Sequence, residues 1–105
     1  MSVLESRKKS LEEKHRRDKE LDFKIQARRN KLLGVWAAGK LGLSDGAADA
    51  YIKEVIASDF DEPGDQDVLK KVHNDLLNNQ VDISENIIRR EMDKFLEIAR
   101  KQLIE

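Results

Sequence analysis

The residues best suited to hold a metal ion lie in the acidic segment 58–67, which contains four aspartates and one glutamate. If an EF-hand loop is counted from Asp59, Gly64 falls at position 6, as calcium loops require. Position 5 is then Pro63, and position 12, which must supply a bidentate glutamate, is Lys70. The chain cannot complete a calcium cage in this register. We therefore predict that the segment is a turn between two helices.

No other group of residues has the spacing of a catalytic or cofactor site. His15 and His73 are far apart, and neither has a second histidine at ligand spacing, whereas a zinc site needs three or four converging ligands. The chain has no cysteine, which excludes a thiolate nucleophile and a disulfide framework. It also lacks the glycine-rich phosphate loop with its lysine. We expect no enzymatic activity, no cofactor and no metal.

The strongest sequence feature is a basic segment at the N-terminus. Residues 1–31 hold 11 Lys or Arg against 6 Asp or Glu, whereas residues 32–105 hold 9 against 15. Between Met1 and Glu20 the only apolar residues are Met1, Val3, Leu4 and Leu11. Two leucines cannot offset the roughly 20–40 kcal/mol of backbone entropy that ordering such a segment costs. We predict a mobile, partly helical arm over residues 1–18.

Residues 19–105 carry the apolar periodicity of four helices. The first runs from about residue 21, with Gly42 as its stop, and Ser44 is expected to cap the second through its hydroxyl. Pro63 suits the first turn of the third helix, and Ser84 the N-cap of the fourth. The expected inner faces contain Leu21, Phe23, Ile25, Leu32, Leu33, Trp36, Ala37 and Leu41; Ala48, Tyr51, Ile52, Val55 and Ile56; Val68, Leu69, Val72, Leu76 and Leu77; and Ile88, Met92, Phe95, Ala99 and Leu103, flanked by Ile87, Leu96 and Ile98.

Composition supports an all-α fold, a four-helix bundle with a flexible basic arm. The 105 residues fit one domain, and charged and hydrophobic residues each make up 39% of the chain, with a single proline. The net charge of -1 argues against a nucleic-acid-binding cation as a whole. No apolar run approaches the roughly 20 residues that span a bilayer, and the first residues do not resemble a secretory signal. We expect a cytoplasmic protein that is monomeric when free.

Two blocks, residues 27–39 (ARRNKLLGVWAAG) and 58–68 (SDFDEPGDQDV), resemble the zeta inhibitory subunit of alphaproteobacterial F-type ATP synthases. The resemblance implies a four-helix bundle with a mobile N-terminal extension. In that family the extension enters the catalytic head between the α and β subunits and reaches the γ rotor. It blocks rotation in the direction of ATP hydrolysis. The arm over residues 1–18 would then be inhibitory.

The resemblance places the inhibitory stretch over roughly residues 4–19. Leu4, Leu11, Ile25 and Leu32 fall on one heptad register, so a docked arm would continue into the bundle's first helix. This chain has His15 and Arg16 where the family commonly has an aromatic and a small residue, which makes the arm more basic. The expected partner-binding residues are Leu4, Arg7, Lys8, Leu11, Lys14, His15, Arg16, Arg17 and Asp18.

Two other interpretations remain open at this point. The cations of the arm could contact nucleic-acid phosphates, although acidic residues such as Glu12 and Glu13 interrupt them and no aromatic is present to stack on bases. The chain could also be a structural bundle whose arm is a solvated tail. Salt-sensitive DNA binding would favour the first of these, and inhibition of ATP hydrolysis would exclude both as the main function.

Overall fold

The computed structural model describes residues 3–60 and 65–104, and for residues 3–18 and Phe60 it describes the backbone only. In chain order the elements are helix α1 (Val3–Lys40), helix α2 (Asp45–Ala57), the short 3₁₀ helix η1 (Ser58–Phe60), helix α3 (Gln66–Asn78) and helix α4 (Glu85–Ile104). No strand occurs in these ranges. The predicted all-α class with four α-helices is confirmed.

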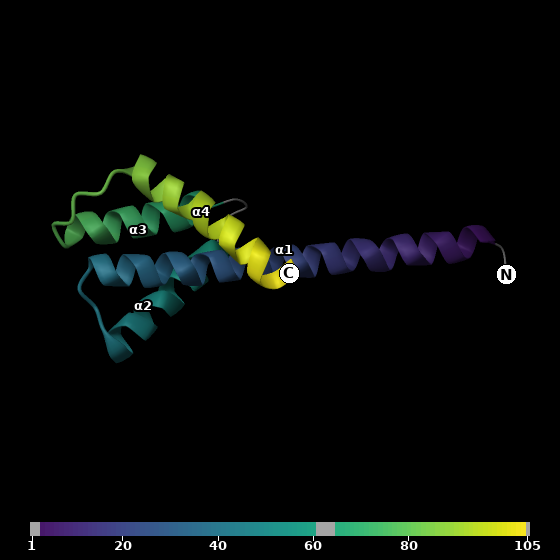
Figure 1. The fold of residues 1–105 in the computed structure, drawn as a ribbon, viewed down its shortest axis with the longest axis horizontal. Coiled ribbons are helices and arrows are strands. Elements are labelled where there is room, and N and C mark those ends of the chain that lie inside the picture. The colour runs from purple at the N-terminus through teal and green to yellow at the C-terminus, as the bar shows by residue number, and fades with distance from the viewer. Residues whose placement is uncertain (1–2, 61–64, 105) are drawn as a thin grey trace.

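Helix α1 is the axis of the molecule. Its C-terminal half packs mainly against α2 and α4, and α3 lies beside α4 (Figure 1). Its N-terminal half continues beyond the other helices, which gives the chain an elongated shape of 64 × 25 × 22 Å. The last turn of α4 lies beside α1 near the point where α1 leaves the bundle, since Leu103 lies next to Phe23.

The end of α1 is set by Gly42, as predicted. Gly42 has a φ of +74°, which glycine adopts without a steric penalty. This turn lets the backbone N–H of Leu43 donate to the carbonyl of Ala38 at 2.9 Å, and the N–H of Gly42 donate to Gly39 at 3.2 Å. The last carbonyls of the helix are thereby satisfied before the chain turns into α2.

The two predicted serine caps behave differently. Ser84 caps α4, because its Oγ accepts the backbone N–H of Ile87 at 3.3 Å. Ser44 stands at the N-cap position of α2, but its hydroxyl makes no capping hydrogen bond, so that part of the prediction is wrong. The next residue, Asp45, has a φ of +51°, which removes the regular first turn that a capping hydroxyl needs.

In the described residues α3 begins at Gln66, with Asp65 at its N-cap position. The prediction for Pro63 lies outside the described residues. The apolar face predicted for this helix is confirmed for Val68, Leu69, Val72 and Leu76.

The core is formed where α1 meets the other three helices. Gly34 allows α2 to approach α1 closely, because a Cβ added there would lie 3.1 Å from the Cα of Ile52. Most of the expected inner residues are confirmed. The buried cluster comprises Leu33, Ala37, Ala38, Tyr51, Val55, Val68, Leu69, Val72, Leu76, Ile88 and Met92, with Trp36 and Phe95 partly buried against it.

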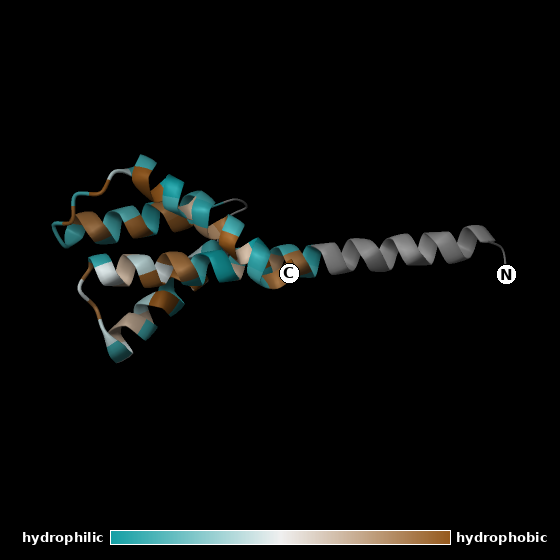
Figure 2. Cartoon of the chain, in the orientation of Figure 1, coloured by the Kyte–Doolittle hydropathy of each residue, from teal (hydrophilic) through white to brown (hydrophobic). Residues whose placement is uncertain are grey.

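Three residues of the expected inner faces are instead exposed. Phe23 is 56%, Leu77 48% and Ile87 45% exposed. Phe23 lies beside Ile56 and Leu103, which belong to the last turns of α2 and α4, and Leu77 lies in the last turn of α3, so neighbouring helices cover Phe23 and Leu77 only partly. Figure 2 shows hydrophobic and hydrophilic segments alternating along the packed helices, as expected of amphipathic helices.

Candidate functional site at the base of the long helix

The sequence-predicted partner-binding residues all lie in the part of α1 that precedes the bundle. Their side chains lie outside the described residues, so the structure does not test whether they form one surface, nor whether the arm is mobile. The residues concerned are Leu4, Arg7, Lys8, Leu11, Lys14, His15, Arg16, Arg17 and Asp18.

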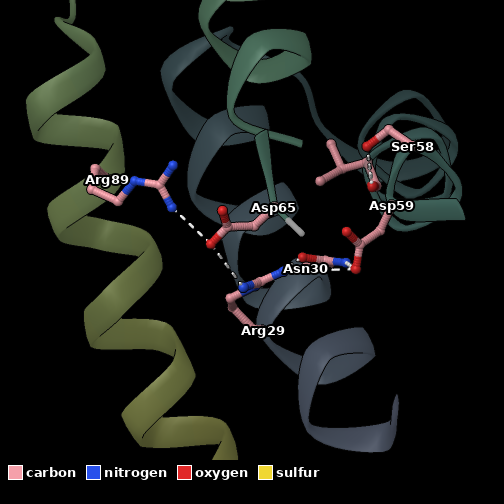
Figure 3. Close-up of polar contacts among 7 residues, drawn as sticks. Arg29, Asn30, Ser58, Asp59, Asp65 and Arg89 are labelled. Atoms are coloured by element: carbon pink, nitrogen blue, oxygen red, sulfur yellow. Dashed lines mark hydrogen bonds and ion pairs between the residues drawn. The ribbon is translucent and has the colours of Figure 1, made fainter. Parts of the chain in front are cut away.

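The described part of the site is a polar cluster around Arg29 and Asn30. These residues lie where α1 enters the bundle, which we call the base of α1. Arg29 and Asn30 are 5% and 1% exposed. The Arg29 Nε donates to the Oδ1 of Asn30 at 3.0 Å, and the Asn30 Nδ2 donates to the Oδ2 of Asp59 in η1 at 3.0 Å (Figure 3). Arg29 Nη2 also lies 3.7 Å from that same Asp59 oxygen. Two consecutive residues of α1 are thereby bound to the segment that follows α2.

Asp59 is held in place by the end of α2. The Ser58 hydroxyl donates to the carbonyl of Val55 at 2.6 Å, which continues α2 into η1 and fixes where the carboxylate of Asp59 lies (Figure 3). Through Asp59, the described beginning of the acidic segment therefore pairs with a buried arginine. In the described residues no group of three His, Asp or Glu side chains could hold a metal ion.

The second acid of the cluster, Asp65, joins α1 to α4. Its Oδ2 accepts a hydrogen bond from Arg89 Nη1 at 2.7 Å and lies 3.5 Å from Arg29 Nη1. Partial burial raises the pKa of Asp65, but the hydrogen bond from Arg89 and the charges of Arg89 and Arg29 outweigh it and leave the pKa below its ordinary value. Asp65 is therefore ionised at neutral pH and links both arginines.

Replacing this carboxylate should destabilise the bundle. We expect Asp65→Asn to lower the free energy of unfolding by about 1–3 kcal/mol at pH 7, because it leaves the buried Arg29 charge with only Asp59. Because the folded pKa of Asp65 is depressed, its contribution is present above the unfolded pKa of about 3.9 and is lost as the pH falls through the folded value. Urea unfolding at pH 7 and pH 3 measures both effects.

The matched control for this test is Asp49→Asn, at an exposed position of α2. It lowers the number of negative charges by one, as Asp65→Asn does, but Asp49 forms no ion pair with an arginine among residues 19–59 and 65–104. If Asp49→Asn costs as much as Asp65→Asn at pH 7, the cluster does not hold the base of α1.

The sequence itself carries a signal for this cluster. Ile25, Arg29, Leu33 and Ala37 step by four residues, so Arg29 occupies the buried stripe of α1. A charged residue in such a stripe is buried only if it is paired. The aspartates of segment 58–67 are the nearest concentration of acids that follows in the sequence.

A second polar group joins α2 to α3. The buried Tyr51 hydroxyl donates to the Oδ2 of Asp75 at 2.9 Å, and Lys71 Nζ lies 3.1 Å from that oxygen and 3.3 Å from Glu54. Burial, together with Asp75 and Glu54, raises the pKa of Tyr51, so it stays a neutral donor. This group stabilises the packing of α2 against α3.

Among residues 3–60 and 65–104, no α-helix combines the length and the apolar character that a bilayer-spanning segment needs.

Comparison with known proteins agrees with this architecture. A search of curated proteins found no match. A solved solution NMR structure is 40% identical to this chain over 80% of it and 95% of the solved chain, with a TM-score of 0.71. The sequence model of the family described as ATPase inhibitor subunit zeta matches residues 1–102. The chain therefore belongs to the ATPase inhibitor subunit zeta family.

Proposed function

We propose that the N-terminal half of α1 docks as a helix between the α and β subunits of the F-type ATP synthase, reaches the γ subunit and blocks rotation during ATP hydrolysis. Membership in an ATPase inhibitor family supports inhibition of the synthase as the general function. The observation that carries the mechanism is the continuity of α1, a single 38-residue helix whose first half lies beyond the bundle.

The dimensions favour entry of the helix alone. A single helix with its side chains is about 10–12 Å wide, and 18 residues extend about 27 Å along its axis. The molecule as a whole is 25 × 22 Å in its two shorter directions. A gap between subunits that is just wide enough for one helix is too narrow for the bundle. The bundle would therefore limit how far the helix enters.

The polar cluster supports this role for the base of α1. Buried Arg29 and Asn30 bind the helix to η1 and, through Asp65, to Arg89 of α4. A helix held in this way cannot turn about its axis without breaking buried charge pairs, which is costly. The bundle would therefore present the arm in one fixed orientation and resist the torque of the rotor.

Within the arm, the two leucines should matter more than any single cation. We expect Leu4→Ala and Leu11→Ala each to weaken inhibition about tenfold, because buried apolar anchors carry most of the energy of an interface. Single changes at Lys8 or Lys14 should mainly lower a salt-dependent association rate. The measurement is ATP hydrolysis by the purified catalytic head, titrated with each full-length variant. Equal inhibition by the leucine variants and the unchanged chain would exclude these anchors.

A further inference from the structure

A groove with an apolar floor lies at the base of the projecting part of α1. It has a volume of about 350 Å³ and lies where α1 passes the C-terminal ends of α2 and α4. Figure 2 shows hydrophobic segments of α1 and α4 at this end of the bundle. The lining residues are Phe23, Lys24, Ala27, Arg28, Lys31, Ile56 and Leu103.

The rim of the groove is cationic. Lys24, Arg28 and Lys31 are spaced by four and three residues, which places them on one face of α1. Arg28 donates from Nη1 to the neutral Oε1 of Gln102 at 3.1 Å. Within residues 19–60 and 65–104, no carboxylate pairs with Lys24, Arg28 or Lys31. Exposed lysines elsewhere in the described bundle, such as Lys53 and Lys70, also lack an acidic partner, but Lys24, Arg28 and Lys31 differ from them in lining one apolar groove together.

We propose that this groove binds an acidic amphipathic helix of the same protein that receives the N-terminal half of α1. The apolar floor would take the hydrophobic stripe of that helix, and the three cations would pair with its carboxylates. Residues 24–31 span about 10 Å of α1, which is two turns of a helix lying alongside it. The proposal rests on the proposed function and adds a second contact, outside the arm.

The position of the groove favours this occupant. The groove and the arm belong to the same helix, so a protein that holds the arm lengthwise brings its own surface to the groove. Surface charges tend to be complementary across such contacts, and three cations grouped around one apolar groove favour an acidic surface over a basic or neutral one. A nucleic acid or a second copy of the chain is a different occupant, and the test separates these outcomes.

Charge reversal on the rim tests the proposal. Lys24→Glu/Lys31→Glu in the full chain is compared with Lys53→Glu/Lys70→Glu, two exposed lysines of α2 and α3 that do not line the groove. Both doubles change the net charge equally. At about 50 mM salt the rim variant should bind the purified catalytic head about tenfold more weakly than the unchanged chain, and the control within about twofold. At about 500 mM salt the difference should shrink.

The apolar floor is tested by Phe23→Ser, at a position that is 56% exposed. This variant should weaken binding about threefold at both salt concentrations, because apolar burial is not screened. Circular dichroism melting of each variant establishes that the bundle is intact.

The outcomes separate the two proposals. If the unchanged chain inhibits the head and the rim variant binds it equally well, the groove proposal is wrong and the arm mechanism stands. If the rim and control variants weaken binding equally, the effect is one of net charge and the groove is not the site. If the unchanged chain neither binds nor inhibits the head, both proposals fail. Loss of DNA binding or of self-association in the rim variant, with head binding unchanged, assigns the groove to that other partner.

Discussion

Removal of residues 1–18 is expected to abolish inhibition of ATP hydrolysis and to change the melting temperature of the bundle by less than about 3 °C. The buried hydrophobic residues of the described structure lie between Ile25 and Ala99, and Lys19 and Glu20 are exposed. Residues 19–105 therefore contain the described core, while the segment proposed to enter the synthase is lost. Thermal melting and ATP hydrolysis by the catalytic head measure the two effects on one preparation.

The inhibition assay and the melting temperature each test a different part of this prediction. Full inhibition by residues 19–105 would show that the bundle, and not the arm, is the inhibitor. A fall in melting temperature of more than about 10 °C would show that the arm packs on the bundle and that the boundary at residue 18 is misplaced. The domain division stays a prediction until this measurement is made.

The second large effect is expected in the core. Leu76 is fully buried in α3, whereas its neighbour Leu77 is 48% exposed. Leu76→Ala should lower the free energy of unfolding by about 2–5 kcal/mol, because it removes buried methyl groups and leaves a cavity. Leu77→Ala should cost less than about 1 kcal/mol. Urea unfolding of both variants makes a matched comparison, and equal losses would contradict the packing of α3.

Helix ends and most of the core were predictable because they depend on local chemistry and periodicity. Gly42 ends α1 through its positive φ, and Ser84 caps α4 through its hydroxyl, as the sequence indicated. Ser44 was predicted incorrectly because the capping pattern does not reveal the positive φ of Asp45. Local sequence rules describe regular first turns and miss a distorted one.

Exposure was less predictable, because it depends on where neighbouring helices stop. Phe23 follows the apolar period of α1 but is 56% exposed, because its neighbours Ile56 and Leu103 belong to the last turns of α2 and α4. The cluster around Arg29 was missed for a related reason. Its members come from α1, η1, the N-cap position of α3 and α4. Only the fold brings Asp59 and Asp65 to Arg29, and Arg89 to Asp65. The arm over residues 1–18 stays a prediction from charge and apolar content.

The most direct test of the central claim is to locate the arm in the inhibited complex. The chain has no cysteine, so a single Ser10→Cys in the full chain can carry a photoactivated crosslinker. A control, Asp49→Cys, places the same crosslinker at an exposed position of α2. With the catalytic head and ATP, we expect residue 10 to crosslink to both the α and β subunits and residue 49 to crosslink to neither. Crosslinks from residue 49 to the α–β interface, with none from residue 10, would contradict this expectation.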